Sequence, residues 1–144
     1  MRITALIILI ICAGCSDQLT SPKDPGSQIN LSTDKSFYTL LDTINIILKN
    51  NSAEDLMVGL RCGNFLELSS QKQSDGGLSN YPEFWYMSLG CATFPDTVKS
   101  KLERVYSLPA DIFNNNGNFR FVLNAYILQR DSSLILTSNF FNIE

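Results

Sequence analysis

The sequence predicts an all-β protein, an antiparallel β-sandwich of about seven to nine strands. From Ile29 onward the apolar residues recur with a period of two, which is the period of a half-buried strand and not of a helix. These runs are short, and clusters of Gly, Asn, Asp, Ser and Pro separate them. Short strands at regular spacing, with turn signals between them, are typical of a sandwich.

In the first half of the domain, the segment Thr43–Asn50 is the clearest strand, since alternate residues of one face are apolar. These residues are Ile44, Ile46 and Leu48. Two shorter strands are predicted at Leu56–Cys62 and Phe65–Ser70, joined by a tight turn at Gly63-Asn64. The polar stretch Gln71–Asn80 contains Asp75-Gly76-Gly77 and is predicted to be a surface loop.

In the second half, Glu83–Leu89 and Thr97–Leu108 are predicted strands because both are rich in aromatic or β-branched residues. The turn formers of Asn114–Asn118 come next and precede the longest strand. Its inward residues are expected to be Phe119, Phe121, Leu123, Ala125 and Ile127. A turn at Asp131-Ser132-Ser133 leads into the last predicted strand, Leu134–Ile143.

The first fifteen residues have the features of an export signal. Arg2 gives a positive start, Ile3–Ile11 is almost wholly apolar, and small residues precede Cys15. This apolar run is too short to cross a bilayer, which takes about 20 residues. The ending Cys12-Ala13-Gly14-Cys15 resembles the lipobox of bacterial lipoproteins, and this resemblance implies that Cys15 is acylated and becomes the mature N-terminus. The alternative is plain secretion with cleavage after Gly14.

Cysteine parity favours lipidation over plain secretion. If residues 1–14 are removed, three cysteines remain, namely Cys15, Cys62 and Cys91, and an unpaired thiol would be left over in a secreted protein. Acylation of Cys15 leaves the pair Cys62 and Cys91, which we expect to form a disulfide in an oxidising exported compartment. The alternative is two buried thiols.

The domain organisation follows from composition. Residues 1–14 are a predicted signal peptide, residues 15–28 a tether with Pro22, Pro25 and Gly26, and residues 29–144 a single domain. The lipid bilayer is therefore one expected partner, through Cys15, and the expected location is the cell envelope, at the outer membrane with the domain in the periplasm or at the surface. The net charge of −3 with no basic stripe argues against nucleic acid.

The residue content argues against catalysis and against cofactors. The chain has no histidine, which removes the commonest general base and metal ligand. Cys62 and Cys91 have no neighbouring cysteine that would make a zinc motif. Acidic residues that lie near one another in sequence could in principle form a carboxylate pair, but we interpret them as solvated residues of strand ends and loops. They are Glu67, Asp75, Glu83, Asp96 and Glu103.

Two parts of the domain resemble bacterial immunoglobulin-like domains, including intracellular proteinase inhibitor-type and macroglobulin-type modules. Leu31–Tyr38 followed by Asp42–Ile46 and Asn50-Asn51-Ser52 is similar to their first two strands. Gly117–Phe121 and Ser138–Ile143 are similar to their last two strands. The resemblance implies an immunoglobulin-like sandwich. It also raises protease inhibition as an alternative function.

A cluster of aromatic residues between Tyr81 and Pro95 is the candidate partner-binding segment, because Tyr and Trp often dominate binding energy. Trp85 is expected in the core, as in many immunoglobulin domains. Phe84 and Tyr86, in the opposite phase, are then expected to face outward, and Tyr81 and Phe94 complete the set. The sequence thus favours a tethered, non-catalytic binding module with a protein or other envelope partner; the alternatives are a protease inhibitor or a structural subunit of an envelope complex.

Overall fold

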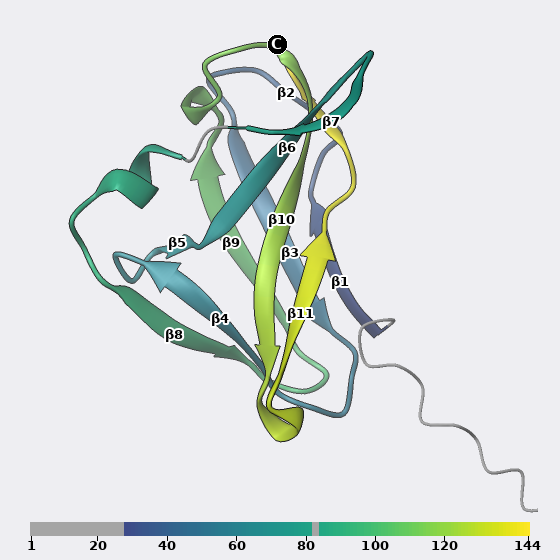
Figure 1. Ribbon diagram of the computed structural model, residues 1–144, viewed down its shortest axis with the longest axis vertical. Helices are drawn as coiled ribbons and strands as arrows, with labels where there is room; N and C mark the ends of the chain where they lie inside the picture. Colours follow the sequence, from purple (N-terminus) through teal and green to yellow (C-terminus); the bar gives the residue numbers. More distant parts are fainter. Residues whose placement is uncertain (1–27, 82–83) are drawn as a thin grey trace, which may run out of the picture.

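A computed structural model of the chain describes residues 28–81 and 84–144, and within this part the protein is all-β (Figure 1). Its strands are β1 (Ile29–Thr33), β2 (Phe37–Tyr38), β3 (Thr43–Asn50), β4 (Leu56–Arg61), β5 (Phe65–Leu66), β6 (Leu68–Ser74), β7 (Gly77–Asn80), β8 (Thr93–Val98), β9 (Glu103–Pro109), β10 (Gly117–Ile127), β11 (Ser132–Thr137) and β12 (Phe141–Ile143). Residues 29–81 and 84–144 also contain short 3-10 helices, namely η2 (Trp85–Ser88), η3 (Ala110–Ile112) and η4 (Leu128–Arg130). The predicted signal peptide, the predicted lipidation site Cys15 and the predicted tether up to residue 27 lie outside the described residues.

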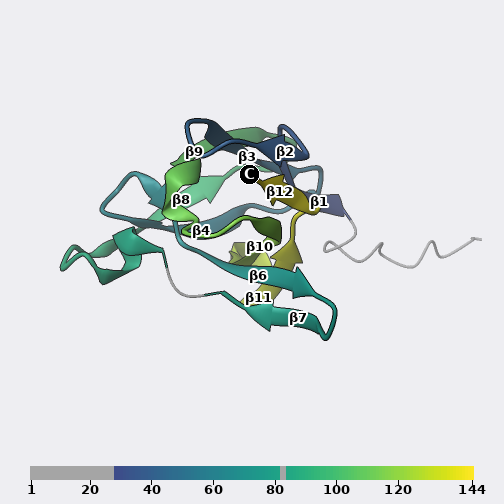
Figure 2. The ribbon, with the colours of Figure 1, turned by 90° about the horizontal axis from the view of Figure 1, so that it is seen from above.

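The strands form two facing sheets, and the predicted immunoglobulin-like sandwich is confirmed (Figures 1 and 2). The small sheet has the order β1-β3-β9, and in the large sheet β10 lies between β11 and β4. These correspond to the A-B-E and C-F-G strands of immunoglobulin domains. All strand pairs are antiparallel except β2 with β12, which are parallel.

The core lies between the two sheets, where the predicted alternation holds. On β3 the residues Ile44, Ile46 and Leu48 are buried, as expected. The inward residues of β10 also agree with the prediction, and its outward residues are polar or half-buried. Much of the core volume is aromatic, and Phe113 packs edge-on or tilted against its neighbours, as aromatic rings prefer. The fully buried rings are those of Tyr38, Tyr86, Phe113, Phe119, Phe121 and Phe141.

Several predicted elements differ from the structure. Thr97–Leu108 is not one strand: Thr97 and Val98 end β8, and the later residues belong to β9. A turn separates the two strands, in which Lys101 has a positive φ of 63° and Leu102 N donates to Lys99 O. The stretch Gln71–Asn80 is not a loop: β6 runs to Ser74 and forms a hairpin with β7, because polar residues are well accommodated in a hairpin exposed on most sides. The last strand is divided into β11 and β12 at Ser138, whose hydroxyl accepts a hydrogen bond from Phe121 N at 2.9 Å. The segment Glu83–Leu89 contains the 3-10 helix η2 in place of a strand.

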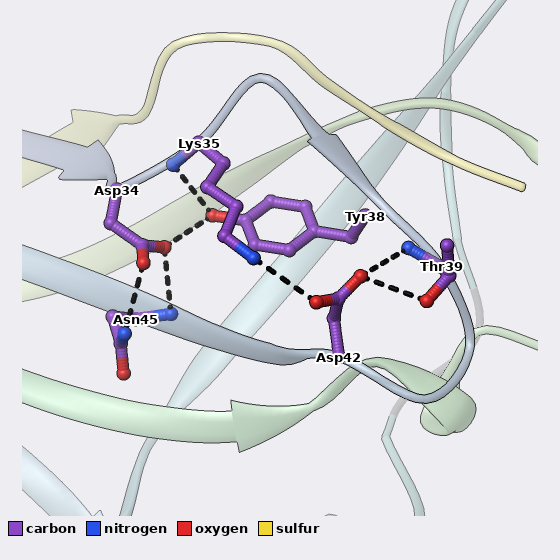
Figure 3. Close-up of polar contacts among 6 residues, drawn as sticks. All are labelled: Asp34, Lys35, Tyr38, Thr39, Asp42 and Asn45. Atoms are coloured by element: carbon purple, nitrogen blue, oxygen red, sulfur yellow. Dashed lines mark hydrogen bonds and ion pairs between the residues drawn. The ribbon is translucent and has the colours of Figure 1, made fainter.

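A polar network fixes the connection from β1 through β2 to β3 (Figure 3). The Tyr38 hydroxyl donates to Asp34 Oδ1, and Asp34 also accepts from the backbone and side chain of Asn45 at 3.1 and 2.9 Å. Asp42 accepts from Thr39 N at 2.7 Å and from Lys35 Nζ at 3.0 Å. These are the residues that carry the resemblance to immunoglobulin-like domains, and their role here is to hold a turn.

The network shifts the pKa values of its members. Burial, reinforced by the hydrogen bond to Asp34, raises the pKa of Tyr38 to about 12. For Asp34, burial alone would raise the pKa, but the hydrogen bonds from Tyr38 and Asn45 outweigh it and lower the pKa. The hydrogen bond from the Thr39 backbone, with that from Lys35, lowers the pKa of Asp42 to about 2.

Candidate functional site

The segment between β7 and β8 contains most of the aromatic residues that were predicted to bind a partner. Two of these side chains are buried and cannot contact a partner. Phe84 is 3% exposed and Tyr86 is fully buried, so the expectation that they face outward is wrong. The alternation of a strand does not apply here, because Phe84 is the N-cap residue of the 3-10 helix η2 and Tyr86 lies within that helix. Phe84 packs on Phe113, and the Tyr86 hydroxyl donates to Leu66 O at 3.1 Å.

The two other candidates differ from each other. Tyr81 is half-buried, and its ring packs on Phe119 and Phe113 with centroid distances of 5.0 and 5.8 Å. Phe94 is 54% exposed and is the one of the four predicted residues that presents most of its surface to solvent. The predicted core position of the Trp85 side chain lies outside what the structure describes.

A disulfide and an arginine fix the end of this segment. Cys62 and Cys91 are bonded, as expected, and Cys62 N donates to Ala92 O at 3.1 Å. The Arg61 guanidinium donates to the carbonyl oxygens of Met87 and Leu89 at 3.0 and 3.3 Å. These hydrogen bonds hold the segment that contains Met87 and Leu89 against the end of β4.

Next to this segment, an open hollow of about 410 Å³ lies on the outer face of the large sheet. The hollow forms because two different strands pair with the same edge of β10. The strand β6 pairs with β10 as far as Leu123, and β4 pairs with it only from Tyr126. Asn124 and Ala125 therefore have no registered partner on this side among the described residues, and the neighbouring strands diverge around them. The lining comes from β4, β8 and β10: Met57, Val58, Gly59, Thr93, Pro95, Asn124, Ala125 and Tyr126.

Gly59 brings a carboxylate close to this hollow. A Cβ atom at position 59 would lie 2.6 Å from Glu67 Oε2, so the Glu67 side chain occupies the space that a larger residue would fill. The Thr93 hydroxyl contacts Glu67 Oε1 at 3.4 Å, at the long limit of a hydrogen bond. Glu67 takes part in none of the three ion pairs found among the described residues.

This arrangement is suited to binding. A half-buried carboxylate beside an open, largely apolar hollow can accept hydrogen bonds from a positively charged group, while the hollow takes its apolar part. Sequence reasoning missed the hollow and interpreted Glu67 as solvated. The glycine inside the predicted strand Leu56–Cys62 was the available signal, because such a glycine often marks a close approach.

Neither a metal centre nor a membrane span is found within residues 28–81 and 84–144. No group of three or more His, Cys, Asp or Glu side chains in this part could hold a metal ion. No helix in this part has the length and hydropathy needed for a membrane span.

Comparisons with known proteins identify no family and no function. No protein-family model matches the sequence. No curated protein matches it either. Among solved structures, the chain is similar to a PapD-like domain of human CEP192, with a TM-score of 0.36, 11% identity and coverage of 100% of this chain and 96% of the other. It is also similar to a bacterial immunoglobulin-like domain of the M. primoryensis ice-binding adhesin, with a TM-score of 0.35, 10% identity and coverage of 80% and 91%.

Proposed function

We propose that this protein is an exported, lipid-anchored binding module of the bacterial cell envelope. The supporting features of the N-terminus are those of the sequence: a short apolar signal, small residues and Cys15, which would carry the acyl chains. Two or more acyl chains give an effectively permanent anchor, since each buried methylene adds about 0.8 kcal/mol. A module anchored in this way, in the outer membrane, acts on partners within reach of its tether.

The observation that carries the binding role is the Glu67 carboxylate beside the hollow. A carboxylate that is partly removed from water is costly unless it is hydrogen-bonded or paired with a cation. Here the long contact from Thr93 is its side-chain hydrogen bond, and no lysine or arginine of the described residues forms an ion pair with it. A cation supplied by a partner would complete this site.

The hollow suits a side chain with an apolar stem and a positively charged end, as lysine and arginine have. Met57, Pro95 and Tyr126 offer apolar contact to the stem, and Glu67 attracts the charged end. The proposed partner is therefore an envelope protein that inserts a basic side chain. Because the disulfide and Arg61 hold the adjoining segment, its ordering entropy is lost on folding and not on binding, which favours affinity.

Capture from solubilised envelopes tests this function. The full-length protein should retain a partner that the Glu67→Gln variant captures about tenfold less well, since a charge-assisted hydrogen bond is lost while the shape is kept. Asp75→Asn is the matched control, because Asp75 is an exposed carboxylate in the turn between β6 and β7. Its capture should equal that of the wild type.

The wild-type interaction should also weaken as salt is added, because part of it is electrostatic. Equal capture by the wild type and Glu67→Gln, at low salt and with both proteins folded, would show that the hollow is not the binding site.

A further inference from the structure

The small sheet ends at β9, and this edge is open. All seven residues of β9 are registered against β3, and among the described residues no strand pairs with its other side. In immunoglobulin sandwiches of the constant type, a fourth strand, D, follows E at this place. In this protein the chain between β4 and β9 joins the large sheet instead, so the position of D is left free.

The backbone groups on this edge can be identified from the hydrogen bonds at both ends of β9. Asn50 N donates to Leu102 O, and Ala110 N donates to Asp42 O, so even-numbered residues direct their backbone groups toward β3. Along an antiparallel strand, successive residues direct their backbone groups alternately toward one neighbouring strand and toward the other side. The N–H and C=O groups of Glu103, Val105 and Ser107 therefore point away from the sheet. No hydrogen bond among the described residues uses these groups.

The neighbouring edge, β8, is protected in a way that β9 is not. Cys62 N donates to Ala92 O, so by the same alternation Pro95 lies with its backbone on the free side of β8. Proline has no N–H to offer there, and proline is a common means of blocking an edge strand. On β9, Val105 is the middle one of the three residues whose backbone groups face the free side, and it is 56% exposed, while the proline stands at the end of the strand.

A strand added to β9 would also have a surface to cover. Phe94 on β8 is opposite Leu60 and so has the phase of the interior, yet it is 54% exposed. The Tyr106 hydroxyl donates to Asp96 Oδ2 at 2.9 Å, which shows that β8 and β9 face each other across the sandwich. Figure 2 shows the large sheet reaching sideways past β9, so that it underlies the free position.

Charge indicates what such a strand would carry. Arg104 is exposed, has the inward phase of β9 and belongs to none of the ion pairs among the described residues. Asp96, in contrast, already accepts hydrogen bonds from Tyr106 and from Thr97 N. An acidic residue on the added strand is therefore complementary to this edge.

We propose that the β9 edge binds an extended peptide segment of a partner protein by strand addition. Backbone hydrogen bonds to Glu103, Val105 and Ser107 provide the register, an apolar side chain of the peptide covers Phe94, and an acidic one pairs with Arg104. The inference rests on the proposed role as a binding module, but it uses a surface distinct from the hollow beside Glu67.

Selection from a random peptide library displayed on phage, with the full-length protein as target, tests this proposal. The selected peptides should combine alternating apolar residues with an acidic one. Their affinity should fall about tenfold for Val105→Pro, which removes a free-edge N–H and leaves the β3 ladder intact, and similarly for Phe94→Ala. Val105→Thr keeps the N–H and is the matched control; it should bind like the wild type.

Amide hydrogen exchange gives a second readout that does not depend on the fold of a variant. Binding of a selected peptide to the wild type should protect the Val105 and Ser107 amides. Failure to select any peptide, unprotected amides, or equal binding to Phe94→Ala would overturn the proposal. Peptide binding should be unaffected by Glu67→Gln. The experiment therefore distinguishes a failure of strand addition at β9 from a failure of binding at the hollow.

Discussion

Replacing Phe84 with Ala should destabilise the protein by about 3–5 kcal/mol, the usual range for removing a buried phenylalanine ring. Phe84 is 3% exposed, and its ring packs on those of Phe113, Tyr86 and Phe121 with centroid distances of 5.3, 5.5 and 6.0 Å. The change loses both the transfer free energy of the ring and its contacts, and it leaves a cavity among aromatic side chains that cannot all move into it.

The matched variant is Phe94→Ala, the same chemical change ten positions along the chain at a side chain that is 54% exposed. Its effect on the free energy of unfolding should stay within about 0.5 kcal/mol. Urea unfolding at equilibrium measures both values, and thermal unfolding should show a decrease in Tm of roughly 10–20 °C for Phe84→Ala alone. A loss below about 1 kcal/mol for Phe84→Ala would refute its assignment to the core.

Three further predictions concern the stability at low pH, the disulfide and the N-terminus. The Asp42 pKa is lowered to about 2, so its stabilising effect is complete above the ordinary value of 3.8 and is lost as pH falls toward 2; Asp42→Asn should flatten the Tm profile over that interval, and an unchanged profile would contradict this role. Replacing both Cys62 and Cys91 with Ala should cost up to about 3.5 kcal/mol in urea unfolding, given their separation of 29 residues, and no loss would mean that the bond does not stabilise the fold. Intact-mass analysis of membrane-extracted protein should show loss of residues 1–14 and added acyl mass on Cys15, whereas an unacylated soluble species starting at Cys15 would rule out lipidation.

The parts of the fold that follow a regular period were predictable from the sequence. Alternation alone assigns Ile44, Ile46 and Leu48 to the core, and β3 has the bounds that this pattern predicts. A tight turn after β4 was also predictable, but its position was wrong by one residue. The prediction placed it at Gly63-Asn64, whereas the structure centres it on Cys62 and Gly63, whose φ angles are 55° and 76°. Local patterns succeed here because each strand meets the same two environments, core and solvent, along its whole length.

The segment Glu83–Leu89 shows where this reasoning fails. Its composition favours a strand, but tertiary packing places Phe84 and Tyr86 in the core from a 3-10 turn. The hollow could not be predicted for a different reason. It forms because β6 and β4 pair with different parts of β10, and no local sequence pattern reveals that pairing. The open edge of β9 likewise depends on strand order and not on the residues of β9 alone.

Hydrogen–deuterium exchange on the captured complex shows whether the partner binds at the hollow. The full-length protein is compared with and without the partner retained from solubilised envelopes, and exchange is followed peptide by peptide. We predict slower exchange in β4, in β8 and around Asn124–Tyr126, the segments that line the hollow. Unchanged exchange in all three segments, with the partner bound and protection confined to other parts of the domain, would contradict the proposed site.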